Sequence, residues 1–230
     1  MIIKKILLNN FTNFYGKHVL ELQEGMNLIV GSGGSGKTNL AKAFRFAVLG
    51  YSDFPKCDLI NFQHRQECLE GGEDSFCRVE IEMQRKGEDY LIQGELSLIG
   101  NKKIRQFLTV DSEIDNVITS KTFKFIYFDP SSAFERQCNN NLPRAVHMTQ
   151  TICERLKLNL RLNIRMAFLD GVLPLLSEEH GKNLLNHIVS SGLEQTIIME
   201  KLVLPSLEDF PLKIHHLDFD GDNLSAKFIG

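Results

Sequence analysis

The first fifty residues alternate between apolar and polar positions and then change period. Three short runs rich in aliphatic and β-branched residues have the pattern of strands, with turns expected at Tyr15-Gly16-Lys17 and at Glu24-Gly25. A glycine-rich loop follows, and the apolar residues then recur with helical spacing until Gly50 ends the pattern. The predicted strands are 2–8, 18–22 and 26–30, and the predicted helix is 37–49.

The rest of the chain continues to alternate strand and helix patterns. Residues 51–75 are polar and predict an irregular segment, whereas 76–100 alternate with period two around Lys86-Gly87-Glu88, as a hairpin does. Further strands are predicted at 123–128, 166–170 and 196–199, helices at 144–163 and 177–190, and a terminal strand pair around 219–222. This order favours an α/β fold with an added antiparallel β-lobe.

Composition and charge narrow the classes of protein. The 230 residues carry a formal net charge of -3, which argues against a protein that coats nucleic acid or anionic membrane through its overall charge. No run approaches the roughly 18 consecutive apolar residues of a membrane helix. The five cysteines form no C-x-x-C pair, so neither a disulfide framework nor a zinc site is indicated. We therefore expect a cytoplasmic protein with no membrane partner.

A phosphate-binding motif lies between the third strand and the first helix. The sequence GSGGSGKT fits G-x-x-x-x-G-K-[ST], in which glycines let backbone N–H groups point at phosphate oxygens at a helix N-terminus. Lys37 would reach the β- and γ-phosphates of ATP, and the Thr38 hydroxyl would bind Mg²⁺. The predicted nucleotide-binding residues are Gly31, Ser32, Gly33, Gly34, Ser35, Gly36, Lys37, Thr38 and Asn39.

These residues resemble the opening of a known family. The strand ending in Asn10-Phe11, the approach EGMNLIV and the Asn39 after Lys37-Thr38 are similar to the head domain of SMC and RecF ABC-type ATPases, a group that includes the ATPase of the double-strand-break repair nuclease complex. The resemblance implies a P-loop NTPase with an ABC-ATPase-like core sheet, helices and an antiparallel β-lobe. It also implies ATP and Mg²⁺ as ligands.

The resemblance further implies one ABC-ATPase-like domain over 1–230. In this division the β-lobe comes from about 1–25 and 76–110, and the α/β core from about 26–50 and 123–200. A closing hairpin spans about 212–229. The family's long coiled-coil insertion is absent.

The chain also departs from the family's pattern at the hydrolytic residues. The family's Walker B aspartate is followed by a glutamate that orients the attacking water, but Asp170 is followed by Gly171. The signature sequence is missing where the chain has 142–146, and the strand after Gln195 ends in Met199-Glu200, without the family's switch histidine. Gln93 is a weak candidate for the glutamine of the Q-loop. Hydrolysis of ATP is therefore left open.

Two aspartates compete for the Walker B position that would hold Mg²⁺. Asp170 ends a buried-looking strand and is followed by the helix and strand that the family order requires, which favours it. Asp129 also ends an apolar strand and remains the alternative. Glu178 and Glu179 are weak candidates for a replacement base, since carboxylates in a first helical turn behind Ser177 commonly serve the helix itself.

The sequence supports three hypotheses for function. The first is an ATP-binding SMC/RecF-like protein in which nucleotide acts as a switch or structural ligand, in a DNA repair or chromosome-associated assembly. Its partners would be a second copy or an intact ABC-type head, with DNA as a further candidate. The second is a P-loop kinase that uses Asp129 and a lid containing Arg136 or Arg144. The third is an interaction protein whose P-loop is vestigial.

Overall fold

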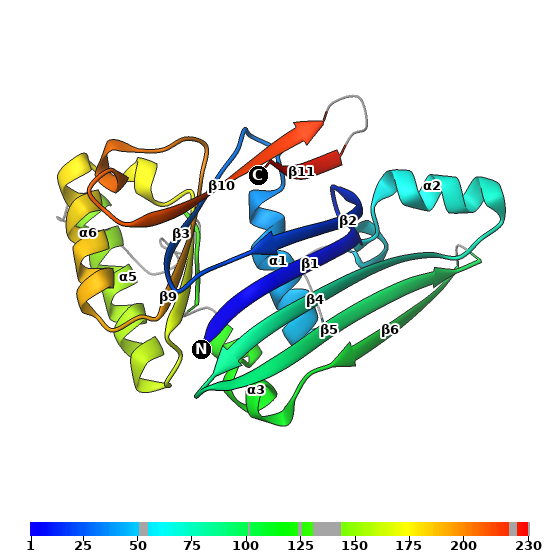
Figure 1. The fold of residues 1–230 in the computed structure, drawn as a ribbon, viewed down its shortest axis with the longest axis horizontal. Helices are drawn as coiled ribbons and strands as arrows, with labels where there is room; N and C mark the ends of the chain where they lie inside the picture. Colours follow the sequence, from blue (N-terminus) through cyan, green and yellow to red (C-terminus); the bar gives the residue numbers. More distant parts are fainter. Residues whose placement is uncertain (51–54, 101, 124–125, 131–143, 221–224, 230) are drawn as a thin grey trace.

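A helix packed between two β-sheets organises the molecule. The computed structural model describes the chain except residues 51–54, 101, 124–125, 131–143, 221–224 and 230. Helix α1 (Lys37–Leu49) lies between the sheets, and two further helices, α5 (Arg144–Arg161) and α6 (Glu178–Ser190), cover the other face of the second sheet (Figure 1). The fold is therefore α/β, as the alternating sequence pattern predicts.

The first sheet is antiparallel and forms the β-lobe. Its order is β2-β1-β4-β5-β6 within the described residues. The inward side chains of β1, β4 and β5 alternate with outward ones and pack on α1, so one face of the sheet is buried and the other faces solvent. The strands are β1 (Ile2–Phe11), β2 (Phe14–Glu21), β4 (Ser75–Arg85), β5 (Glu88–Ile99) and β6 (Lys103–Thr109).

The second sheet is parallel apart from its last pair. Its order is β11-β10-β3-β9-β8-β7 within the described residues, with only β10 and β11 antiparallel. β3, β8 and β9 are covered on both faces, which explains their nearly continuous apolar sequences. The strands are β3 (Gly25–Val30), β7 (Tyr127–Phe128), β8 (Met166–Asp170), β9 (Gln195–Glu200), β10 (Leu212–Asp220) and β11 (Ser225–Ile229).

Helix α1 joins the two sheets because it is apolar around most of its circumference. Phe44 and Phe46 are fully buried, and the Phe44 ring centroid lies 5.4 Å from that of Phe168 in β8. Burying one such side chain contributes about 1.5–3 kcal/mol, which holds the start of α1 in a fixed place at the edge of the parallel sheet. The remaining helical segments are α2 (Phe62–Gly71), α3 (Ser112–Val117), α4 (Ser120–Phe123), η1 (Lys56–Leu59), η2 (Leu173–Leu175) and η3 (Pro205–Leu207).

Three local predictions are wrong. The first hairpin turns at Thr12-Asn13, because Thr12 adopts a φ of 51°, while Gly16 lies inside β2. The segment predicted as irregular contains α2, whose start is capped when the Asn61 side chain accepts the His64 N–H. Of the strand predicted at 123–128, the described residues contain only β7, because Phe123 belongs to α4; residues 124–125 lie outside the described part of the chain.

Candidate functional site

The glycine-rich loop connects the carboxyl end of β3 to the start of α1, at the edge where parallel α/β sheets bind ligands. A Cβ at Gly31 would lie 2.1 Å from the Leu217 carbonyl oxygen of β10, so a side chain there would displace backbone. Gly34 and Gly36 have φ values of 84° and 100°, a region that favours glycine. The loop therefore requires glycine for both space and conformation.

The Lys37 side chain folds back over this loop. Its Nζ donates hydrogen bonds to the carbonyl oxygens of Gly31 and Ser32, at 2.6 Å and 2.8 Å. Burial lowers the pKa of Lys37, and the nearby carboxylates of Asp170 and Glu200 oppose that shift. The ammonium group is thus held at the loop, within electrostatic range of two acids that end neighbouring strands.

The start of α1 carries no group of its own to balance the helix dipole. Gly36 at the N-cap provides no side-chain hydrogen bond, and the first turn contains no acidic residue. Elsewhere, the Ser177 hydroxyl caps α6, and Glu178 and Glu179 lie in its first turn. An uncapped helix start beside a lysine is suited to an anion such as a phosphate group.

Asp170 lies beside the phosphate loop at the end of β8. The Thr38 hydroxyl donates to Asp170 Oδ2 over 2.7 Å, and the Tyr127 hydroxyl donates to the same oxygen over 2.8 Å. A threonine hydroxyl and a carboxylate are hard oxygen donors of the kind that Mg²⁺ takes in nucleotide sites. These residues therefore fit the predicted ion.

The structure brings the second aspartate to the same edge. β7 and β8 are parallel, and Phe128 pairs with Leu169, so Asp129 and Asp170 follow at matching positions. A cavity of about 300 Å³ contains Thr38 and Asp129 in its wall, together with Lys42 and Arg45 of α1. Both predicted acids therefore follow strands that end at the same edge of the sheet as the phosphate loop. The structure describes a direct hydrogen bond from Thr38 to Asp170 and none from Thr38 to Asp129.

Asn13 is a site residue that the sequence patterns did not indicate. Its side chain accepts a hydrogen bond from Asn39 Nδ2 at 2.7 Å and donates one to the Gly34 carbonyl oxygen at 3.3 Å. The Ala226 N–H donates to the Asn13 carbonyl oxygen, so the β1–β2 turn links the phosphate loop to the closing hairpin. Because the sequence pattern places this turn three residues later, it does not reveal the role of Asn13.

Glu200 is the second residue that sequence reasoning did not place in the site. It ends β9, the strand between β3 and β8, and its side chain is buried, at 2% exposure. Burial raises the pKa of Glu200 to about 8, and the Asp170 charge adds to that rise, while Lys37 and the Leu173 N–H oppose it. The sequence feature that could have indicated Glu200 is its position at the end of a predicted buried strand, near where the family has its switch histidine.

Other candidates from the sequence lie away from this edge or outside the described residues. Glu178 pairs with Lys182 at 3.2 Å on α6, and the structure describes no contact from Glu178 or Glu179 to the phosphate loop. Gln93 faces away from α1, because a Cβ on the adjacent Gly94 would contact α1. Arg136 and residues 142–143 lie outside the described residues, and the side chain of Arg144 is not described.

Comparisons with known proteins show the family and the fold of the chain. The model of the family AAA_23, described as an AAA domain, matches residues 5–168. The chain belongs to this AAA domain family. A curated relative from Nanoarchaeum equitans (strain Kin4-M), the DNA double-strand break repair Rad50 ATPase, is 31% identical over 104 residues, which are 45% of this chain and 12% of that protein. The match therefore spans about one eighth of the relative's length.

Solved structures share the whole fold at low sequence identity. The SMC head bound to the C-winged helix domain of ScpA is 15% identical, with a TM-score of 0.66 over 100% of this chain and 97% of that one. The recombination mediator protein RecF is 12% identical, with a TM-score of 0.51 over 99% and 98% of the two chains. Together these findings confirm the predicted fold, that of the SMC and RecF heads.

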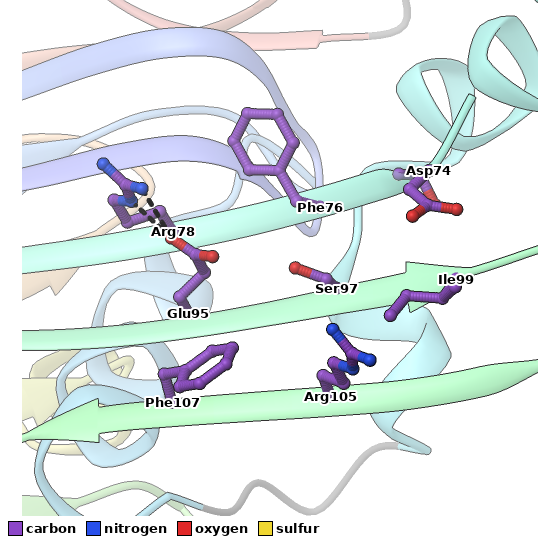
Figure 2. A pocket seen from close by; sticks show the side chains of 9 residues that line it. Asp74, Phe76, Arg78, Glu95, Ser97, Ile99, Arg105 and Phe107 are labelled. Carbon is purple, nitrogen blue, oxygen red and sulfur yellow. Dashed lines mark hydrogen bonds and ion pairs between the residues drawn. The ribbon is translucent and has the colours of Figure 1, made fainter.

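A second hollow, of about 320 Å³, lies on the solvent face of the antiparallel sheet (Figure 2). Arg78 donates to Glu95 over 2.8 Å across its floor, and Arg105 and Phe107 of β6 line one side (Figure 2). Lysines on the same lobe are also paired, as in Lys4 with Asp89. This mixture of charges does not favour a polyanion on that face.

None of the described helices is both long enough and apolar enough to cross a bilayer.

Proposed function

We propose that this chain binds ATP and Mg²⁺ through residues 31–39 and Asp170, and that nucleotide switches an SMC/RecF-type head between states. The observation that carries the proposal is the 2.7 Å hydrogen bond from Thr38 to Asp170, which joins the phosphate loop to a carboxylate 132 residues away. The uncapped start of α1 and the lysine beside it supply positive potential for the phosphates. When bound, Mg²⁺ would neutralise phosphate charge between Thr38 and Asp170.

The partner in this proposal is an ABC-type head with an intact signature sequence. In the family this chain resembles, the signature of one head covers the nucleotide on the other. The missing signature at 142–146 therefore predicts an asymmetric pair, in which the partner completes the site that contains Lys37. A role in DNA repair or chromosome maintenance is the corresponding proposal for the process, supported by the names of the relatives.

Nucleotide binding is tested by thermal unfolding in the presence of MgATP, MgADP or MgGTP. Ligand at 100 times its Kd should stabilise the native chain by about 2.7 kcal/mol. Lys37→Ala should abolish this stabilisation, because it removes the cation at the loop, whereas Lys17→Ala changes an exposed lysine on β2 and should retain it. Equal stabilisation of the wild type and Lys37→Ala would contradict the proposal.

The family assignment favours this proposal over the kinase alternative. A P-loop kinase would share the phosphate loop, so the feature that favours a kinase is Asp129, which lines a cavity together with Thr38. Transfer of the γ-phosphate to an added small molecule, without release of inorganic phosphate, would support the kinase instead. Absence of any stabilisation by nucleotides would leave the vestigial loop as the explanation.

A further inference from the structure

The main chain of Glu200 is part of the phosphate loop's support. Glu200 pairs with Val30, the last residue of β3, and its carbonyl oxygen accepts the Gly31 N–H at 3.2 Å. On the adjacent strand β8, Asp170 pairs with Met199 of β9. The end of β9 is therefore fixed between the start of the phosphate loop and the aspartate that contacts Thr38.

The side chain of Glu200 reaches the segment that follows Asp170. Glu200 Oε1 accepts the Leu173 N–H at 3.2 Å, and for Oε2 the described residues provide no hydrogen bond. The charged groups that face the carboxyl are Asp170 on β8 and Lys37 on α1. This buried acid is thus within electrostatic range of the lysine that would hold the γ-phosphate.

Gly171 leaves space where related ATPases have a glutamate. It has a φ of 63°, and a Cβ built on it would meet no atom within 4 Å. The Glu200 carboxyl accepts a hydrogen bond from the N–H of Leu173, two residues after Gly171. An acid from the neighbouring strand is therefore hydrogen-bonded to the segment that begins at Gly171, where residue 171 itself contributes no side chain.

We infer that Glu200 accepts the proton of the attacking water during ATP hydrolysis, in place of a glutamate at residue 171. This inference rests on the proposed ATP binding. The water oxygen forms a bond to the γ-phosphorus, and its proton passes to Glu200 Oε2. The bond from the γ-phosphorus to the β–γ bridging oxygen breaks, and its electron pair leaves with ADP.

Two properties of the site support this role. Positioned bases need a pKa near the working pH, and burial raises the pKa of Glu200 to about 8. The groups that oppose the rise, Lys37 and the Leu173 N–H, favour the ionised carboxylate that must accept the proton. Asp170, by contrast, is bonded to two hydroxyl groups and would serve the metal ion.

The test compares Glu200→Gln with Glu179→Gln and Glu200→Asp. Glutamine keeps an oxygen for the Leu173 N–H but accepts no proton, so Glu200→Gln should fold, bind MgATP within about twofold of the wild type, and lower kcat by about 100-fold or more. Glu179→Gln changes an exposed acid on α6 and should leave kcat unchanged. Glu200→Asp should retain part of the activity.

The pH profile provides a second readout that a structural role would not produce. Wild-type kcat/KM should rise about tenfold per pH unit below about 8 and then level off, whereas the residual activity of Glu200→Gln should not follow this curve. Because the proposed base belongs to this chain, slow turnover is expected from the chain alone, without the partner head. Wild-type turnover by Glu200→Gln, or ATP binding without any slow turnover by the wild type, would overturn the inference and leave the proposed ATP binding intact. Failure of the wild type to bind ATP would instead refute the proposed function.

Discussion

Two neighbouring strands end in acids whose environments differ sharply. Asp170 at the end of β8 is partly exposed and accepts hydrogen bonds from Thr38 and Tyr127. Glu200 at the end of β9 is buried and accepts one backbone N–H, and its pKa is raised to about 8. The burial of Glu200 therefore keeps its carboxyl group protonated to a higher pH than that of an exposed glutamate.

The largest expected effect comes from removing the buried acid. The raised pKa means that Glu200 keeps its proton to higher pH in the folded chain than in the unfolded chain, where a glutamate has its ordinary pKa of 4.5. Its contribution to stability is therefore full below about pH 4.5, falls as pH rises, and is lost above about pH 8. The fall is at most about 1.4 kcal/mol per pH unit.

Glu200→Gln should remove this dependence, because glutamine does not titrate. The free energies of unfolding of the wild type and variant should be measured by urea denaturation at intervals from about pH 5 to about pH 9, which spans the raised pKa. The variant should gain stability relative to the wild type as pH rises. Taking the difference cancels the opposite contribution of the half-buried His215, whose lowered pKa of about 4 is shared by both chains. A difference that stays constant with pH would contradict the assignment.

A smaller effect is expected from the partly exposed acid. Asp170→Asn removes the carboxylate that accepts the Thr38 hydroxyl, so MgATP should bind about tenfold more weakly, equivalent to about 1.4 kcal/mol. Binding of ATP in EDTA should change much less. Isothermal titration with and without Mg²⁺ measures both values. Equal losses of ATP affinity with and without Mg²⁺ would show that Asp170 supports the phosphate loop and does not bind the metal ion.

The smallest effect is expected from the hydroxyl that orients Asp170. Tyr127→Phe removes one hydrogen bond to Asp170 Oδ2 and keeps the ring, so unfolding free energy should fall by about 1 kcal/mol. MgATP affinity should fall by only a few-fold, as measured by the same titration. Tyr90→Phe, which removes an exposed hydroxyl bonded to Glu88, is the matched control and should have no effect on MgATP binding. A loss of MgATP affinity larger than that of Asp170→Asn would indicate that Tyr127 contacts the nucleotide directly.

The sequence predictions were accurate where interactions between residues near each other in the chain decide the structure, and less accurate elsewhere. The phosphate loop, α1 and the strand before Asp170 were predictable because their patterns lie within a dozen residues. The first turn was misplaced because glycine at position 16 outweighed Thr12, whose left-handed φ no pattern indicates. α2 was missed since its polar residues produce only a weak apolar face, and its cap is a single asparagine.

By itself, the sequence determined that a glycine loop precedes a helix with a lysine and threonine at its start, because that motif depends on neighbours along the chain. Only the tertiary structure decided which acids lie beside it. Parallel pairing brings the ends of β7, β8 and β9 to one edge, although these strands are far apart in sequence. The burial that raises the pKa of Glu200 arises from that packing, and no local pattern records it.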